Sequence, residues 1–165
     1  MQHFIIKQNK KRPQPGKMGH ITIVYGNIIG ATWKLHDYHK LQRLNKNYLS
    51  SLPATDSFPW IHRDMFNVPD PGNIEGTYRD QVITFGASYK AVEYEWDEWL
   101  EKFEAILQQL YWSSATIHLD TELVGKHTYE WIFDMNQPDN WMCDDPKPTR
   151  SWEFQGGPRK FFDSK

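Results

Sequence analysis

Three side chains with metal-binding chemistry, His118, Asp120 and Glu130, fall within one predicted β-hairpin. Hard divalent cations prefer carboxylate oxygens, and a neutral imidazole is a common additional ligand. A cation held by these residues would suit a small hydrolase or nuclease in which the metal activates water. The same carboxylates would also suit a surface that binds a basic protein, or a solvated sheet face that binds nothing.

The hairpin is predicted from an alternation of apolar and polar residues on both sides of Val124-Gly125-Lys126. Odd positions in 115–123 and 129–135 are predominantly apolar, as the buried face of an antiparallel sheet requires. A three-residue turn places Asp120 directly opposite Glu130, in the register Leu123–His127, Thr121–Tyr129, Leu119–Trp131 and Ile117–Phe133. Like charges opposed across a ladder are unfavourable, so a cation or a basic partner would stabilise this pair. A register changed by one residue would remove it.

Two other groupings could carry chemistry but lack part of what it needs. His36 and His39 are three residues apart and can share a helical face, a spacing that zinc uses, yet no HExxH motif or further ligand accompanies them. Ser88 and Lys90 share one strand face, as a serine activated by a lysine would. The Gly-x-Ser-x-Gly nucleophile turn is absent, because Lys90 stands where its second glycine belongs.

Composition excludes several classes of protein. The net charge of −2 gives no global basic field, so we expect no binding to nucleic acid. No phosphate loop or dinucleotide motif occurs, so we expect no cofactor. Cys143 is the single cysteine, which excludes an internal disulfide, and its acidic neighbours disfavour a thiolate. With no signal peptide and no apolar run of roughly 18 residues, we expect a cytoplasmic protein that does not enter a membrane.

The pattern of elements predicts an α+β fold in a single domain over residues 1–165. We expect an antiparallel or mixed sheet of four to five strands packed against one long amphipathic helix at about 92–111 and a shorter helix at about 37–52. The longer helix is the clearest element, because one broad face is apolar: Trp96, Trp99, Leu100, Phe103, Ile106, Leu107 and Leu110.

Irregular segments interrupt and flank these elements. A basic N-terminal arm, about 8–19, is expected to be a solvated linker. The stretch 52–79 is rich in proline but also carries aromatic residues, so we expect an ordered loop. The tail at about 136–165 is rich in proline and aromatic residues and is expected to be irregular, with Ser151–Gln155 as a candidate edge strand. Glu98 and Glu101 belong to an acidic excess on the long helix that its dipole does not explain.

These features favour a non-catalytic protein-binding module, because no catalytic motif is complete while aromatic and acidic side chains are abundant. The partner is expected to be another protein, such as a basic enzyme. A bacterial immunity protein, which inhibits a toxin or nuclease by covering its active site, has this character. The residues predicted to bind the partner are Trp60, Phe66, Glu98, Glu101, Asp120 and Glu130.

Two alternatives stay open from the sequence. One is a small divalent-metal-dependent hydrolase or nuclease that uses Asp120, Glu130 and His118 on the 115–135 hairpin. The other is a structural subunit that docks into a larger assembly through exposed aromatic residues.

Overall fold

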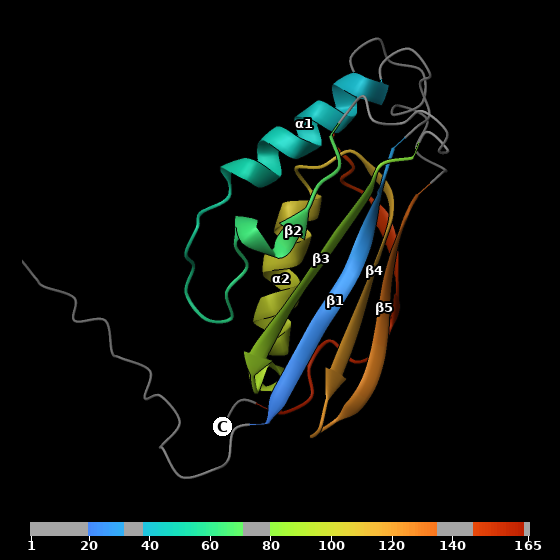
Figure 1. The fold of residues 1–165 in the computed structure, drawn as a ribbon. Helices are drawn as coiled ribbons and strands as arrows, with labels where there is room; N and C mark the ends of the chain where they lie inside the picture. Colours follow the sequence, from blue (N-terminus) through green and yellow to red (C-terminus); the bar gives the residue numbers. More distant parts are fainter. Residues whose placement is uncertain (1–19, 32–37, 71–79, 135–146, 164–165) are drawn as a thin grey trace, which may run out of the picture.

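A six-stranded antiparallel open sheet carries two helices on one of its faces, so the fold is α+β as predicted. The computed structural model describes residues 20–31, 38–70, 80–134 and 147–163. The strands lie in the order β2-β3-β1-β4-β5-β6 (Figure 1). Their bounds are β1 Ile21–Gly30, β2 Phe66–Asn67, β3 Val82–Lys90, β4 Trp112–Thr121, β5 Gly125–Phe133 and β6 Trp152–Gly156.

The sheet exceeds the predicted four to five strands because both of its edges are short strands. β2 has two residues and β6 has five. Short edge strands limit the row of unpaired backbone groups that could pair with another chain. The predicted N-terminal arm and part of the tail lie outside the described residues.

The predicted long helix consists of three pieces. Ala91 adopts a left-handed conformation with φ of 57°, and a short 3₁₀ helix, η2, follows at Val92–Glu95. The α-helix α2 spans Trp96–Leu107. Beyond it, backbone bonds from Gln109 to Ile106 and from Leu110 to Leu107 tighten the chain into turns. The shorter helix, α1, spans Tyr38–Ser51. A second 3₁₀ helix, η1, lies at Arg63–Met65.

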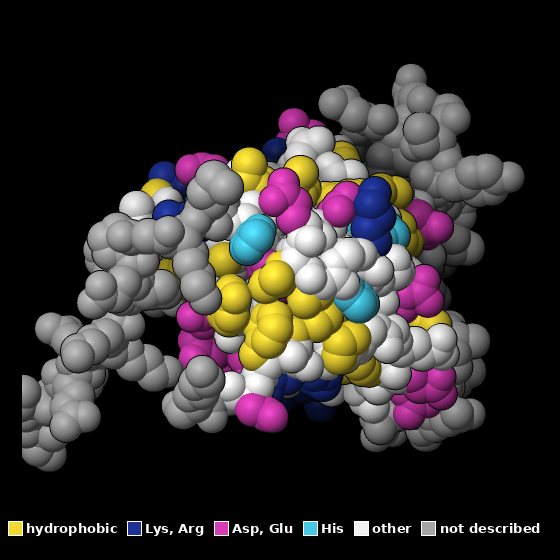
Figure 2. Space-filling model, turned by 90° about the horizontal axis from the view of Figure 1, so that it is seen from below, with side chains coloured by type: hydrophobic (Ala, Val, Ile, Leu, Met, Phe, Trp, Pro, Cys, Tyr) yellow, Lys and Arg dark blue, Asp and Glu magenta, His cyan; other side chains and the backbone are white. Residues whose placement is uncertain are grey.

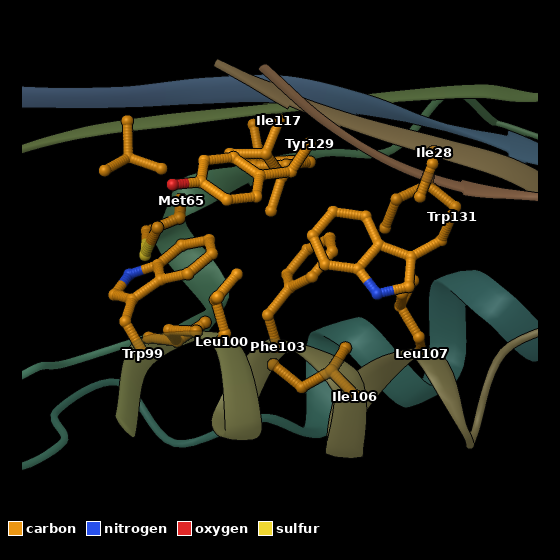
Figure 3. Packing of buried hydrophobic residues seen from close by; sticks show 14 of the residues in the cluster. Ile28, Met65, Trp99, Leu100, Phe103, Ile106, Leu107, Ile117, Tyr129 and Trp131 are labelled. Atoms are coloured by element: carbon orange, nitrogen blue, oxygen red, sulfur yellow. The ribbon is translucent and has the colours of Figure 1, made fainter. Parts of the chain in front are cut away.

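An aromatic layer fills the space between α2 and the sheet (Figure 3). Trp99 and Phe103 project from α2 and stack on each other with ring centroids 5.4 Å apart. Phe103 also lies 5.4 Å from Trp131 of β5 and 5.3 Å from Phe85 of β3. All four rings are buried, which removes large apolar areas from water and contributes to the hydrophobic driving force for folding.

The hairpin of β4 and β5 forms, but its predicted register is wrong. The turn lies at 122–124, so Thr121 pairs with Gly125 and Leu119 with His127. Gly125 has φ of 84°, a conformation that glycine adopts without strain, and the Thr121 hydroxyl accepts a hydrogen bond from the Leu123 amide at 3.1 Å. The displacement is an even number of residues, so the predicted faces are correct although the partners are not.

We expect Phe103→Ala to lower the free energy of unfolding by about 3–5 kcal/mol, because it leaves a cavity among three aromatic neighbours. Urea unfolding followed by tryptophan fluorescence measures the change. Glu101→Ala on the exposed side of α2 is the control, with an expected effect below about 0.5 kcal/mol. An equally small effect of Phe103→Ala would contradict the packing described here.

Candidate functional site

Among the described residues, the face of the sheet that points away from both helices takes no part in packing against a helix. We call it the open face. It carries every second residue of the four long strands, and among the described residues no helix lies on it (Figure 1). Its members are Val82, Thr84, Gly86, Ser88 and Lys90 of β3, Ile21, Ile23, Tyr25, Asn27 and Ile29 of β1, Ser114, Thr116, His118 and Asp120 of β4, and Lys126, Thr128, Glu130 and Ile132 of β5.

Large hydrophobic side chains are exposed on the open face. On β1, which lies inside the sheet, Ile21 is 61% exposed and Ile23 and Tyr25 are each 47% exposed. Val82 and Ile132 add a second apolar group toward the opposite end of the sheet. Single exposed hydrophobic residues are normal, but a row of them along one strand marks an interaction surface.

The rest of the open face carries small side chains, and its charges largely balance. Small serine and threonine side chains separate the larger residues: Thr84, Ser88, Ser114, Thr116 and Thr128. Asp120 lies opposite Lys126, and their oxygen and nitrogen atoms are 3.0 Å apart. Tyr25 and His118 lie side by side with ring centroids 5.0 Å apart, and the His118 Nδ1 atom is 3.0 Å from the Thr128 hydroxyl.

Hydrophobic side chains also gather at the end of the sheet where β1 begins. Figure 2 views the molecule from this end and shows them at its centre. Tyr94 of η2 is exposed here and stacks on Phe162 with centroids 4.7 Å apart. Leu123 of the hairpin turn is exposed as well. The apolar part of the open face therefore begins near a second exposed apolar group.

A buried carboxylate that sequence reasoning missed holds this end of the sheet together. Glu93 of η2 is 1% exposed and accepts hydrogen bonds from Thr22 of β1 at 2.5 Å and from Thr121 of β4 at 3.0 Å. Two hydroxyl donors satisfy both carboxylate oxygens in the core. Only the tertiary fold brings these three residues together, so a local pattern could not reveal them.

The predicted metal site is not assembled. Glu130 lies opposite Thr116, four residues along the ladder from the Asp120–Lys126 pair, so the opposed carboxylates of the prediction are absent. Lys126 provides the positive charge that Asp120 was expected to take from a cation. Within the described ranges, no three His, Cys, Asp or Glu side chains are grouped so that they could hold a metal ion.

Trp60 and Phe66 lie against the core rather than projecting freely from their loop. Trp60 is partly buried and its ring lies 4.4 Å from that of Tyr89, whose hydroxyl donates to the Trp60 carbonyl at 2.8 Å. Burial raises the pKa of this tyrosine. Phe66 packs beside Phe85 at 5.6 Å. Part of each ring therefore stabilises the loop, and only the remainder is accessible to a partner.

Much of the acidic excess on α2 is used inside the molecule. Glu104 receives two hydrogen bonds from the Arg159 guanidinium, at 2.7 and 2.8 Å, and one from the indole of Trp131 at 2.9 Å. The Glu104 carboxylate raises the pKa of Arg159. Asp97 lies 3.6 Å from Lys160. These contacts hold the C-terminal segment against the helix.

The remaining candidates gain no catalytic geometry from the fold. Ser88 and Lys90 are exposed on the flat open face. His36 and Cys143 lie outside the described residues. A hollow of about 310 Å³ lies elsewhere, between α1 and the η1–β2 segment, and is lined by Leu49, Ser50, Arg63, Asp64, Phe66 and Val68.

Comparison with known proteins gives no relative. No protein-family model matches the chain, and no curated protein and no solved structure matches it. In the part of the chain that the structure describes, no helix is long and apolar enough to cross a membrane.

Glu104→Ala is expected to lower the free energy of unfolding by about 1–2 kcal/mol, because it removes the hydrogen-bond partner of the largely buried Trp131 indole. Differential urea unfolding measures this change. Glu104→Gln, which retains an acceptor for the indole, should recover part of the loss. If the alanine and glutamine variants both unfold at the same urea concentration as the wild type, Glu104 does not anchor Trp131 and the C-terminal segment.

Proposed function

We propose that the protein is a non-catalytic protein-binding module and that the open face is its principal binding surface. The observation that carries this proposal is the exposure of Ile21, Ile23 and Tyr25 on a strand inside the sheet, over a face without a helical cover in the described residues. A flat apolar centre with a polar surround is the composition of protein interfaces. The balanced charges and small side chains of this face offer little to a small substrate, which concave pockets bind better.

A narrower version of the proposal is an immunity-type inhibitor that covers the active site of a basic toxin or nuclease. Glu98 and Glu101 support it, because both are exposed on the outer side of α2. Acidic side chains at the rim of an interface accelerate association with a basic partner. Asp120 contributes less to such a surface, since Lys126 neutralises it. Glu130 stays available on the open face.

Affinity capture with the tagged chain tests the open face. We expect Ile23→Lys to reduce the amount of captured protein by at least about tenfold, because burying a lysine in an apolar interface is costly. The matched control is Leu44→Lys, since Leu44 is an exposed aliphatic residue of α1. Both variants should keep the circular dichroism spectrum of the wild type. Equal capture by the wild type and by Ile23→Lys would exclude the open face as the binding surface.

The basic-partner version makes a separate prediction about kinetics. In the double variant Glu98→Lys and Glu101→Lys, the association rate with a recovered basic partner should fall by about tenfold at low salt. The unfolding midpoint should stay close to that of the wild type. Stopped-flow mixing at two ionic strengths measures the rate. An unchanged rate, with no change in its salt dependence, would rule out α2 as an acidic docking surface.

A further inference from the structure

Two strands of the open face, β1 and β5, have a pattern that partly repeats when the face is turned end over end. Gly86, Tyr25, His118 and Thr128 lie side by side on successive strands and form what we call the middle row. On β5, Lys126 and Glu130 are equally distant from this row on opposite sides. Ile21 and Ile29 have the same relation on β1. Lys126 and Glu130, which carry opposite charges, thus lie at equal distances from the middle row, and so do the two apolar residues Ile21 and Ile29.

We propose that the open face is the interface of a homodimer, in which two copies pack face to face about a twofold axis that crosses the strands at the middle row. This inference rests on the proposed function, because it assigns a second copy of the chain to the same surface. Such an axis turns each strand end over end, so residues equidistant from the middle row face each other. Symmetric pairing of one patch with itself is the commonest form of soluble oligomer.

Three of the contacts that this axis produces are favourable, whereas the axis also places Ile23 opposite Asn27 and Lys90 opposite Val82. Lys126 of one copy faces Glu130 of the other, and this ion pair occurs twice in the dimer. Ile21 faces Ile29, which covers the most exposed hydrophobic residue of the face. Asp120 faces Thr116, whose hydroxyl can donate a hydrogen bond to the carboxylate. Packed sheets lie about 10 Å apart at roughly 30°, and the long lysine and glutamate side chains can span the resulting displacement.

Aromatic side chains meet at the axis itself. Tyr25 lies in the middle row, so its ring approaches the Tyr25 ring of the second copy. Gly86 lies beside it on β3 and carries no side chain that would hold the two sheets apart. Aromatic rings at the centre of an interface are typical anchors.

The area and the charge of the open face favour a second copy over a strongly charged partner. The four long strands and the five-residue β6, at about 4.8 Å between strands and about 3.3 Å per residue, span roughly 700 Å². Stable interfaces bury about 800 Å² per partner, so this face alone approaches the required size. Its charged groups are Lys90, Asp120, Lys126, Glu130 and, from β6, Glu153, which lies opposite Ile132. Their net charge of −1 gives little attraction to an acidic or a basic surface. The outer side of α2 stays exposed in this dimer.

Charge reversal in a mixed dimer tests the axis. Sedimentation equilibrium of the full chain should give twice the chain mass of 19.6 kDa. Lys126→Glu and Glu130→Lys should each weaken the dimer by at least about tenfold, because each variant opposes two like charges at both symmetric contacts. An equimolar mixture of the two variants should dimerise again, since both contacts of the mixed dimer then join opposite charges. Glu98→Lys, a matched charge change on α2, should leave the dimer intact.

Two results would overturn the homodimer. One is a wild-type chain that stays monomeric at about 100 µM, well above the Kd of a stable interface. The other is a wild-type dimer whose affinity does not fall in Lys126→Glu or in Glu130→Lys. A mixture of the two variants that fails to dimerise would overturn the proposal in the same way. If the chain is monomeric while Ile23→Lys still loses a captured protein, only the second copy is wrong and the binding module stands. If Ile23→Lys also captures that protein normally, both proposals fail.

Discussion

The contact between α2 and the sheet is the interaction on which the rest of the molecule depends. The inner side of α2 contributes Trp99 and Phe103 to the aromatic layer. One flank of the helix holds the loop before η1, because Lys102 donates to Asp56 at 2.7 Å and to the Ser57 carbonyl at 2.8 Å. Further along the helix, Glu104 binds Arg159 of the C-terminal segment. A helix with an apolar inner face therefore organises two irregular segments through its polar side chains.

Helix α1 is joined to the sheet by polar contacts as well as apolar ones. The Asn45 side chain exchanges hydrogen bonds with the backbone of Tyr111, at 2.8 and 2.9 Å, and also donates to Gln81 at 3.1 Å. Asn45 and Gln81 are buried, so leaving either unpaired would be costly. Because these partners precede β4 and β3, the network fixes α1 at the end of the sheet opposite Glu93. The two helices thus cover one face from end to end.

A sheet covered on one face only has a consequence for function. Both helices lie on the same side, so no helix of the described residues covers the other face (Figure 1). Antiparallel sheets with one solvated face usually expose polar residues there, and this one does so on β4 and, apart from Val82, on β3. The hydrophobic residues of β1 depart from that rule at the strand where a partner would bury them most completely. These exposed hydrophobic residues of β1, rather than a group of catalytic side chains, distinguish the open face.

The sequence by itself determined the properties that local periodicity carries. The alternation in 115–123 and 129–135 predicted which residues of the hairpin are buried, and the spacing of Trp96, Trp99 and Phe103 predicted the inner side of α2, because side-chain direction repeats every two residues in a strand and every 3.6 in a helix. The prediction for α2 and the α+β class are confirmed, and so is the hairpin prediction for 115–121 and 129–133. Leu123 is exposed in the turn instead, and Met135 lies outside the described residues.

Tertiary structure alone decided which residues meet. Two registers of the hairpin that differ by an even number of residues bury the same faces, and the positive φ of Gly125 selects the one in which Lys126 rather than Glu130 lies opposite Asp120. The partners of Glu104 and Glu93 are 27 to 71 residues away in the chain, beyond the reach of any local pattern. The open face itself is likewise a tertiary property, because it depends on both helices packing on the same side of the sheet.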